Sequence, residues 1–226
     1  MTFSLESHPE GLTLIHSDKP DFTYRVDFNT PQFRYRLAHQ HSEALAKAIG
    51  RSKYTHQPIV IDATAGFGRD SFILAHLGCR VIAIEQSEVL AQLVQDALIR
   101  AAQDPALGAT AHQVTLLQGH AEDQLPKIAE TQSIDMIYLD PMFPSKQKSA
   151  LVKKDMQILQ SLVGETPPES ALLSLAMRYA AKIIVKRPRH APPLENRTPT
   201  WQYLGKSARF DIYQGPFSHL DTGKKS

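Results

Sequence analysis

The segment IVIDATAGFGRD, residues 59–70, places a short apolar run directly before a turn that contains two glycines. Its first three residues are β-branched and predict a buried strand. The turn carries Gly66 and Gly68, and residues 70–77 then have the apolar spacing of a helix. A strand, a glycine turn and a helix in this order predict a unit that cradles a nucleotide-type ligand at the start of the helix.

The alternation of strands and helices continues along the chain. Apolar runs and helical spacing predict strands at 81–84, 114–117, 134–139 and 183–185 and helices at 87–102 and 169–181. Runs at 201–204 and 210–213 indicate a final antiparallel pair. We therefore expect an α/β fold with a doubly wound, mostly parallel, Rossmann-like sheet that binds its ligand at the carboxyl ends of the strands.

The first 50 residues do not follow this alternation. Strand-like runs at 12–16 and 23–28 are separated by turn-forming residues and predict a hairpin, and a helical pattern follows at 31–50. We therefore expect an N-terminal hairpin-and-helix subdomain over residues 1–50 and the ligand-binding domain over residues 51–226.

The composition excludes several classes of protein. A chain of 226 residues that is 42% hydrophobic can bury one core with a small appendage. No apolar run reaches the roughly 18 residues of a membrane helix, and the first ten residues lack the layout of a signal peptide, so we expect a cytoplasmic protein without membrane contact. The single cysteine, Cys79, cannot form an internal disulfide or a cysteine metal cage, and we expect no metal.

Candidate ligand contacts cluster around the glycine turn. Glu85 ends the next predicted strand, where a carboxylate accepts hydrogen bonds from ribose hydroxyls. The turn has the form D-x-x-x-G-x-G, and Ala63 or Ala65 stands where a dinucleotide loop has its first glycine. Alone, each feature is common in structural turns. Together they resemble the first motif of S-adenosylmethionine-dependent methyltransferases.

The amino acid end of that methyl donor carries both charges, and residues around the turn suit them. Asp62 is expected near the ammonium group, and Arg69 and Asp70 can address the carboxylate and the ammonium respectively. His120 and Ala121 follow the third predicted strand and are expected near the adenine.

A second motif follows the strand at 134–139. Asp140-Pro141-Met142-Phe143 resembles the (D/N)-P-P-(Y/F) motif of methyltransferases that modify exocyclic or amide nitrogens, with Met142 in place of the second proline. Such a nitrogen is a poor nucleophile because its lone pair is delocalised. The Asp140 carboxylate and the Pro141 carbonyl would accept its two N–H groups and aim it at the methyl group, while Phe143 stacks on the ring. We assign these three residues to catalysis; the alternative is that Asp140 caps a turn and Phe143 fills the core.

Basic residues gather beside this motif in two runs. The candidates for RNA binding are Lys146, Lys148, Lys153, Lys154, Lys186, Arg187 and Arg189. Charge runs are usually solvated faces. In a protein with a net charge of only +2, two runs that converge beside an amine-holding motif predict a rim that binds RNA phosphates.

Five stretches of the chain resemble one family. The stretches DATAGFGRD, LDPMFPSKQKSALVKKDM, QSLVG, IVKRPRHAPPL and RFDIY, within residues 62–213, are similar to the bacterial small-subunit ribosomal RNA guanine-N2 methyltransferase J family. The resemblance implies a class I methyltransferase that moves a methyl group from S-adenosylmethionine to N2 of one guanosine in 16S ribosomal RNA, as free RNA or in the small ribosomal subunit. It also implies a cofactor site lined by Arg69, Asp70, Glu85, Gln86, His120, Ala121 and Asp140.

Three alternatives stay open. A non-catalytic RNA-binding module would not need the intact Asp140 and glycine turn. An oxidoreductase using NAD would need the third glycine and a hydride-relay residue. A methyltransferase acting on another exocyclic or amide nitrogen would share every motif. Methylation of a pyrimidine carbon is disfavoured because Cys79 lies on the wrong strand to be the nucleophile.

Overall fold

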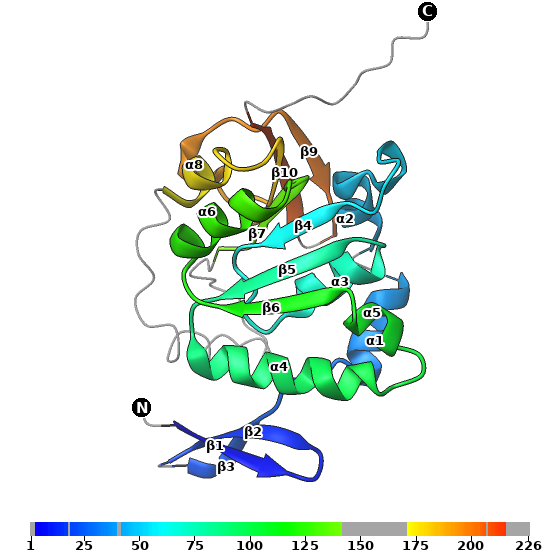
Figure 1. The fold of residues 1–226 in the computed structure, drawn as a ribbon, viewed down its shortest axis with the longest axis vertical. Coiled ribbons are helices and arrows are strands. Elements are labelled where there is room, and N and C mark those ends of the chain that lie inside the picture. Colours follow the sequence, from blue (N-terminus) through cyan, green and yellow to red (C-terminus); the bar gives the residue numbers. More distant parts are fainter. Residues whose placement is uncertain (1–2, 18, 40–41, 142–170, 207, 216–226) are drawn as a thin grey trace, which may run out of the picture.

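The computed structural model describes residues 3–17, 19–39, 42–141, 171–206 and 208–215 (Figure 1). They form two sheets. The smaller sheet is antiparallel and consists of β1 (Phe3–His8), β2 (Gly11–His16) and β3 (Lys19–Tyr24). The larger sheet has seven strands in the order β6-β5-β4-β7-β8-β10-β9. Its strands are β4 (Ile59–Asp62), β5 (Arg80–Glu85), β6 (Val114–Gln118), β7 (Met136–Leu139), β8 (Lys182–Pro188), β9 (Trp201–Leu204) and β10 (Ala208–Gln214).

Helices cover both faces of the larger sheet. The helices are α1 (Pro31–His39), α2 (Ser42–Ile49), α3 (Arg69–His76), α4 (Glu88–Ala102), α5 (Gly108–Ala111), α6 (Ala121–Thr131) and α8 (Leu172–Ala176), with 3₁₀ turns η1 (Arg51–Lys53) and η3 (Leu194–Asn196). Strand residues alternate between two hydrophobic clusters, as the two-residue period of a strand requires. Val60 and Ile184 pack on the side of α1 to α5, whereas Ile61 and Val185 pack with α6 and α8.

The predicted fold class is confirmed. Strands β4 to β8 are parallel, β10 runs antiparallel to both β8 and β9, and every strand predicted after residue 58 overlaps an observed one. The helix predicted at 87–102 is α4, and the Ser87 hydroxyl caps it by accepting the Leu90 N–H. Helices α5 and α6 were not predicted. Among the described residues, no helix is long and apolar enough to span a bilayer.

The N-terminal prediction was partly wrong. Strand β3 begins at Lys19, which pairs with His16, so the turn is tighter than the sequence indicated and the strand ends at Tyr24. Pro20 resembles a turn signal but is tolerated because β3 is an edge strand. The helix predicted at 31–50 is the pair α1 and α2, and β1 was not predicted. The division of the chain at residue 50 stays a prediction.

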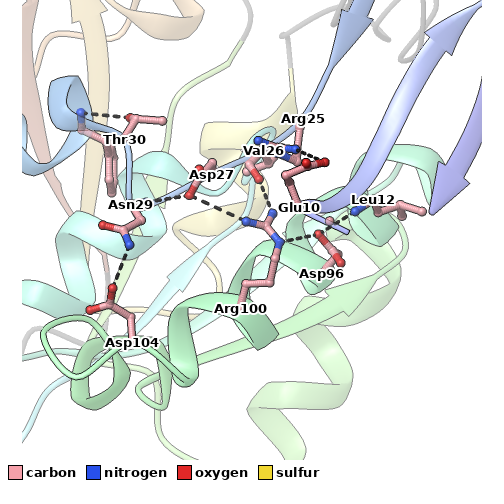
Figure 2. Close-up of polar contacts among 12 residues, drawn as sticks. Glu10, Leu12, Arg25, Val26, Asp27, Asn29, Thr30, Asp96, Arg100 and Asp104 are labelled. Carbon is pink, nitrogen blue, oxygen red and sulfur yellow. Dashed lines mark hydrogen bonds and ion pairs between the residues drawn. The ribbon is translucent and has the colours of Figure 1, made fainter. Parts of the chain in front are cut away.

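Asp96 and Arg100 of α4 join the small sheet and the segment that follows it to the main body, as Figure 2 shows. The Arg100 guanidinium donates to the Asp96 carboxylate at 2.9 Å and to the Val26 carbonyl at 2.5 Å, while the same Asp96 oxygen accepts the Leu12 N–H at 3.0 Å. Gly11 leaves room for the side chains of Arg100 and Asp96. Its φ is +125°, and a Cβ there would overlap the Nε atom of Arg100. The chain thus needs a glycine where β2 meets α4.

We predict that Arg100→Met lowers the free energy of unfolding by about 2 kcal/mol. The variant keeps the apolar stem but removes the hydrogen bonds that Arg100 donates to the Val26 carbonyl and the Asp96 carboxylate, which then keeps the Leu12 N–H. Hydrogen bonds to charged groups contribute about 1.5–3 kcal/mol each. Urea denaturation measures the change. The matched control is Arg80→Met at an exposed position, for which we expect less than about 0.5 kcal/mol. Equal losses in the two variants would contradict the assignment.

Candidate functional site

The candidate site lies at the carboxyl ends of the central strands. The strand order reverses between β4 and β7, and this point is where doubly wound sheets bind their ligands. Asp62 ends β4, Glu85 ends β5 and Asp140 directly follows β7. Lys186 lies in β8, beside the end of β7. Residues predicted from separate motifs are thereby brought to one edge of the sheet.

The glycine turn needs both of its glycines. Gly66 and Gly68 have φ values of +54° and +69°, in the left-handed region that glycine adopts without strain. A Cβ at Gly68 would lie 2.8 Å from the Val94 side chain on α4. The turn closes through the Gly68 N–H, which donates to the Ala65 carbonyl at 2.8 Å, and α3 starts at the next residue. Side chains are thus disfavoured at Gly66 and Gly68 by the backbone, and at Gly68 also by the packing of Val94.

The Glu85 carboxylate binds backbone N–H groups of the glycine turn and of the segment after β5. One carboxylate oxygen accepts the Gly66 N–H at 2.7 Å, and the other accepts the Ser87 N–H at 2.8 Å. Burial raises the pKa of Glu85, and the hydrogen bonds from these backbone groups partly offset that effect. Its contact with ribose hydroxyls stays a prediction.

Asp62 also supports the turn. It is 1% exposed, and its carboxylate accepts the Ser71 hydroxyl at 2.5 Å and the Thr64 N–H at 3.1 Å. Burial raises the pKa of Asp62 to about 7, although these hydrogen bonds lower it. The described contacts of Asp62 are therefore structural, and the predicted contact with an ammonium group stays a prediction.

A cluster of charged side chains connects the glycine-turn helix with the Asp-Pro motif. The Lys186 ammonium donates to Asp70 at 2.6 Å and to Asp140 at 2.7 Å. The Tyr138 hydroxyl donates to the same Asp70 oxygen at 2.7 Å, and Arg36 of α1 lies 3.6 Å from the other one. We call Asp70, Tyr138, Asp140 and Lys186 the bridge cluster. One ammonium group thus joins the two carboxylates that were predicted for the cofactor and for the amine.

The bridge cluster keeps its lysine charged. Burial disfavours the ammonium, but Asp140 and Asp70 outweigh it and raise the pKa of Lys186 above its usual range. Burial also disfavours the Asp70 carboxylate, yet Lys186 and Tyr138 bring the pKa of Asp70 below its usual range. Burial and the Asp70 charge raise the pKa of Asp140. Lys186 therefore acts as a fixed cation and not as a base.

The Asp140 carboxylate remains accessible from outside. Its side chain is 38% exposed, and its backbone N–H donates to the Thr64 hydroxyl at 2.7 Å, which ties the end of β7 to the glycine turn. Pro141 is buried. Phe143 lies outside the described residues, as do Lys146, Lys148, Lys153 and Lys154, so their roles stay predictions.

The remaining predicted cofactor residues lie along the same edge. The Arg69 guanidinium donates to the Tyr24 hydroxyl at 3.0 Å and lies 5.5 Å from the centre of the Phe67 ring. Gln86 follows β5, and His120 precedes α6 and is exposed, whereas Ala121 is buried in the first turn of that helix. Their contacts with a cofactor stay predictions.

The prediction that Lys186 and Arg187 form an exposed RNA-binding run is corrected. Arg187 is 2% exposed and donates to the Pro192 carbonyl at 2.8 and 3.1 Å, and Lys186 belongs to the bridge cluster. The physical reason is the antiparallel pairing with β10, which extends β8 to Pro188. Both residues therefore lie within the sheet, and only Arg189 of the three is exposed.

Several residues of the site were not predicted. Tyr24 comes from β3 and packs its ring 4.7 Å from that of Phe67 in the glycine turn. Arg36 comes from α1, and Tyr138 was hidden within an apolar strand. A tyrosine inside a buried strand is a usable signal because its hydroxyl needs a partner. Tyr24 and Arg36 carried no such signal, since each reaches the site from a distant segment.

Comparisons with known proteins find methyltransferases. A family model for SAM-dependent methyltransferases matches residues 1–215. Ribosomal RNA small subunit methyltransferase J of Thioalkalivibrio sulfidiphilus is 44% identical over 212 residues, which cover 92% of this chain and 82% of that protein. The protein of the same name from Aeromonas salmonicida is 47% identical over 216 residues, with coverage of 93% and 86%.

Solved structures show the same fold. A SAM-dependent methyltransferase from Neisseria gonorrhoeae has a TM-score of 0.77 and 36% identity, with 98% of this chain and 86% of that chain covered. An rRNA methyltransferase from Streptomyces viridochromogenes is 14% identical, with a TM-score of 0.53 and coverage of 76% and 82%. The second likeness supports the fold alone.

We predict that Asp62 makes the folded state less stable as the pH rises. Its pKa is raised from 3.8 to about 7, so between these values the folded chain holds a proton that the unfolded chain has lost, and stability falls with pH in this window. Relative to Asp62→Asn, the parent should lose at most about 1.4 kcal/mol per pH unit. Denaturant unfolding at several pH values in that window measures the difference. If the free energies of unfolding of the parent and of Asp62→Asn changed equally with pH, the prediction would be contradicted.

We also predict that Lys186→Met weakens the binding of S-adenosylhomocysteine about tenfold or more. Without the ammonium, Asp70 and Asp140 face each other as like charges, and charge-assisted hydrogen bonds contribute about 1.5–3 kcal/mol each. Isothermal titration calorimetry measures the affinity. Arg189→Met, which removes an exposed charge just beyond β8, is the control and should bind like the parent. If both variants bind like the parent, the bridge cluster does not shape the cofactor site.

Proposed function

Because the chain belongs to the ribosomal RNA small subunit methyltransferase J family of SAM-dependent methyltransferases, we propose that it methylates the exocyclic N2 amine of one guanosine in 16S ribosomal RNA. The observation that carries the proposal is the position of Asp140. Its partly exposed carboxylate stands at the switch point of the sheet, and its backbone is bonded to the glycine turn through Thr64. The amine-holding motif and the cofactor turn are therefore adjacent.

The residues around the turn fit S-adenosylmethionine. Gly66 and Gly68 shape the turn before α3, and the buried Glu85 accepts the Gly66 N–H. Arg69 and Asp70 begin α3 with opposite charges, as the zwitterionic end of the cofactor requires. When bound, the cofactor supplies an electrophilic methyl group on a sulfonium sulfur.

Asp140 and Pro141 orient the target nitrogen. The Asp140 carboxylate accepts one N–H of the amine and the Pro141 carbonyl accepts the other, which fixes the direction of the lone pair. The amine becomes cationic as it is methylated, and the negative charge of Asp140 stabilises it. Lys186 stays protonated and holds the carboxylate in place. The released proton goes to Asp140 or to water, and Asp140 suits this step because its pKa is raised.

The family assignment removes two of the alternatives, the NAD-dependent oxidoreductase and the non-catalytic RNA-binding module. The guanine base follows from the sequence resemblance to the guanine-N2 enzymes, and the ribosomal RNA follows from the names of the relatives. We place the protein in the cytoplasm, where its partner is the 16S ribosomal RNA or the small ribosomal subunit. No group of three or more metal-binding side chains occurs among the described residues.

We predict that Asp140→Asn slows methyl transfer by a factor of about 100 to 1,000, the typical cost of removing one preorganised electrostatic contact. The amide keeps the shape and one acceptor oxygen but removes the charge beside the nitrogen. Single-turnover methylation of 16S ribosomal RNA, taken from cells that lack this enzyme, measures the rate under saturating cofactor and RNA.

RNA affinity separates catalysis from binding in this experiment. Phosphate contacts dominate the affinity, so Asp140→Asn should bind RNA like the parent. Asp123→Asn, at an exposed position on α6, is the matched control and should keep the parent's rate. A parent-like rate for Asp140→Asn would show that the carboxylate is a structural cap.

A further inference from the structure

A groove of about 480 Å³ lies between α2, η1 and the edge strand β9. Its lining residues are Ala46, Lys47, Gly50, Arg51, Ser52, Lys53 and Tyr203. Three of them are cations, and none of the described lining residues is acidic. Lys47 and Lys53 are exposed, whereas Arg51 donates to the Tyr54 carbonyl at 3.0 Å. The groove is therefore a positively charged hollow.

A fourth cation lies just behind the groove. The Lys182 ammonium donates to the carbonyl of Ile49, the last residue of α2, at 2.8 Å. A Cβ at Gly50 would lie 3.8 Å from this ammonium and 3.5 Å from Lys53 Cδ, so both lysines reach the same turn. Burial, together with the charge of Lys53, lowers the pKa of Lys182 to about 8. The charges of Lys53 and Lys182 repel each other, and a bound anion would relieve that repulsion.

Aromatic surface adjoins the cations. Trp201 is 52% exposed and lies two residues before Tyr203 on β9, so both residues are on the same face of the sheet. Strand β9 is the edge strand of the sheet. The attraction of basic residues to the carboxyl end of α2 explains Lys47, but it does not explain an exposed tryptophan two residues from the groove-lining Tyr203.

The groove adjoins the start of β8 and the candidate active site lies near its end, on the same face of the sheet. Lys182 and Lys186 are four residues apart on β8, so they face the same side and are separated by about 13 Å along the strand. Nucleic-acid-binding grooves commonly span several nucleotides, so this separation is within the length of one bound RNA strand.

We propose that this groove binds a backbone phosphate of the RNA substrate and that Trp201 stacks on a neighbouring unpaired base. The proposal rests on the proposed function for the identity of the RNA. Cations that track the backbone and an aromatic ring that accepts a base are the two elements by which proteins hold single-stranded RNA.

Trp201 provides a direct measurement, because it is the only tryptophan in the chain. Its fluorescence is followed while single-stranded 16S RNA fragments that contain the target guanosine are added to the full-length protein. The test variant combines Lys47→Gln with Lys53→Gln. The control combines Arg80→Gln with Lys127→Gln, which removes the same charge from exposed positions lining a separate groove. All four positions are exposed, so folding should be retained.

We expect RNA to quench the Trp201 fluorescence of the parent and of the control. The test variant should bind about tenfold more weakly, and the slope of its affinity against salt should fall by about 0.7 log units for each phosphate that the protein no longer neutralises. Unchanged fluorescence, or equal affinity and salt dependence in the test variant and the parent, would overturn the proposal.

Methyl transfer, measured in parallel, separates this proposal from the proposed function. A parent that shows lysine-dependent quenching but transfers no methyl group supports the groove and contradicts the function. A parent that methylates the RNA without any response of Trp201 or of the lysine variant supports the function and overturns the groove.

Discussion

The Lys186 ammonium between Asp70 and Asp140 is the interaction on which the candidate site depends. Two carboxylates at the end of a parallel sheet repel each other unless a cation lies between them. Strand β8 supplies that cation at 2.6 and 2.7 Å, and Arg36 and Tyr138 complete the surroundings of Asp70. The bridge cluster thus couples the helix after the glycine turn to the motif after β7. A change in the charge of Asp70 therefore alters the pKa of Asp140.

The local features of the fold could be predicted from the sequence. The parallel strands follow from β-branched runs, the start of α4 from the Ser87 cap, and the turn from Gly66 and Gly68, since each signal lies within a few residues of what it determines. Asp62, Glu85 and Asp140 each stand at the end of a predicted parallel strand, so their position at one edge of the sheet could also be predicted.

The features that could not be predicted depend on distant segments. The length of β8 is set by its pairing with β10, so Lys186 and Arg187 were taken for exposed residues when they lie within the sheet. The small sheet supplies Tyr24 to the glycine turn, and nothing in the sequence near Tyr24 indicates that contact. Periodicity shows which residues form a strand but not which strand lies beside it.

The attachment of β2 to α4 has a consequence for the order in which the chain is assembled. Leu12 donates to Asp96, which is 84 residues further along the chain, and Gly11 fits against Arg100 on the same helix. During synthesis the small sheet leaves the ribosome first, well before the helix that covers it has been made. The face of the small sheet that packs on α4 therefore stays exposed to solvent until α4 has been synthesised. The nascent protein passes through a stage with exposed apolar strands, during which chaperones can bind it and misassembly can compete.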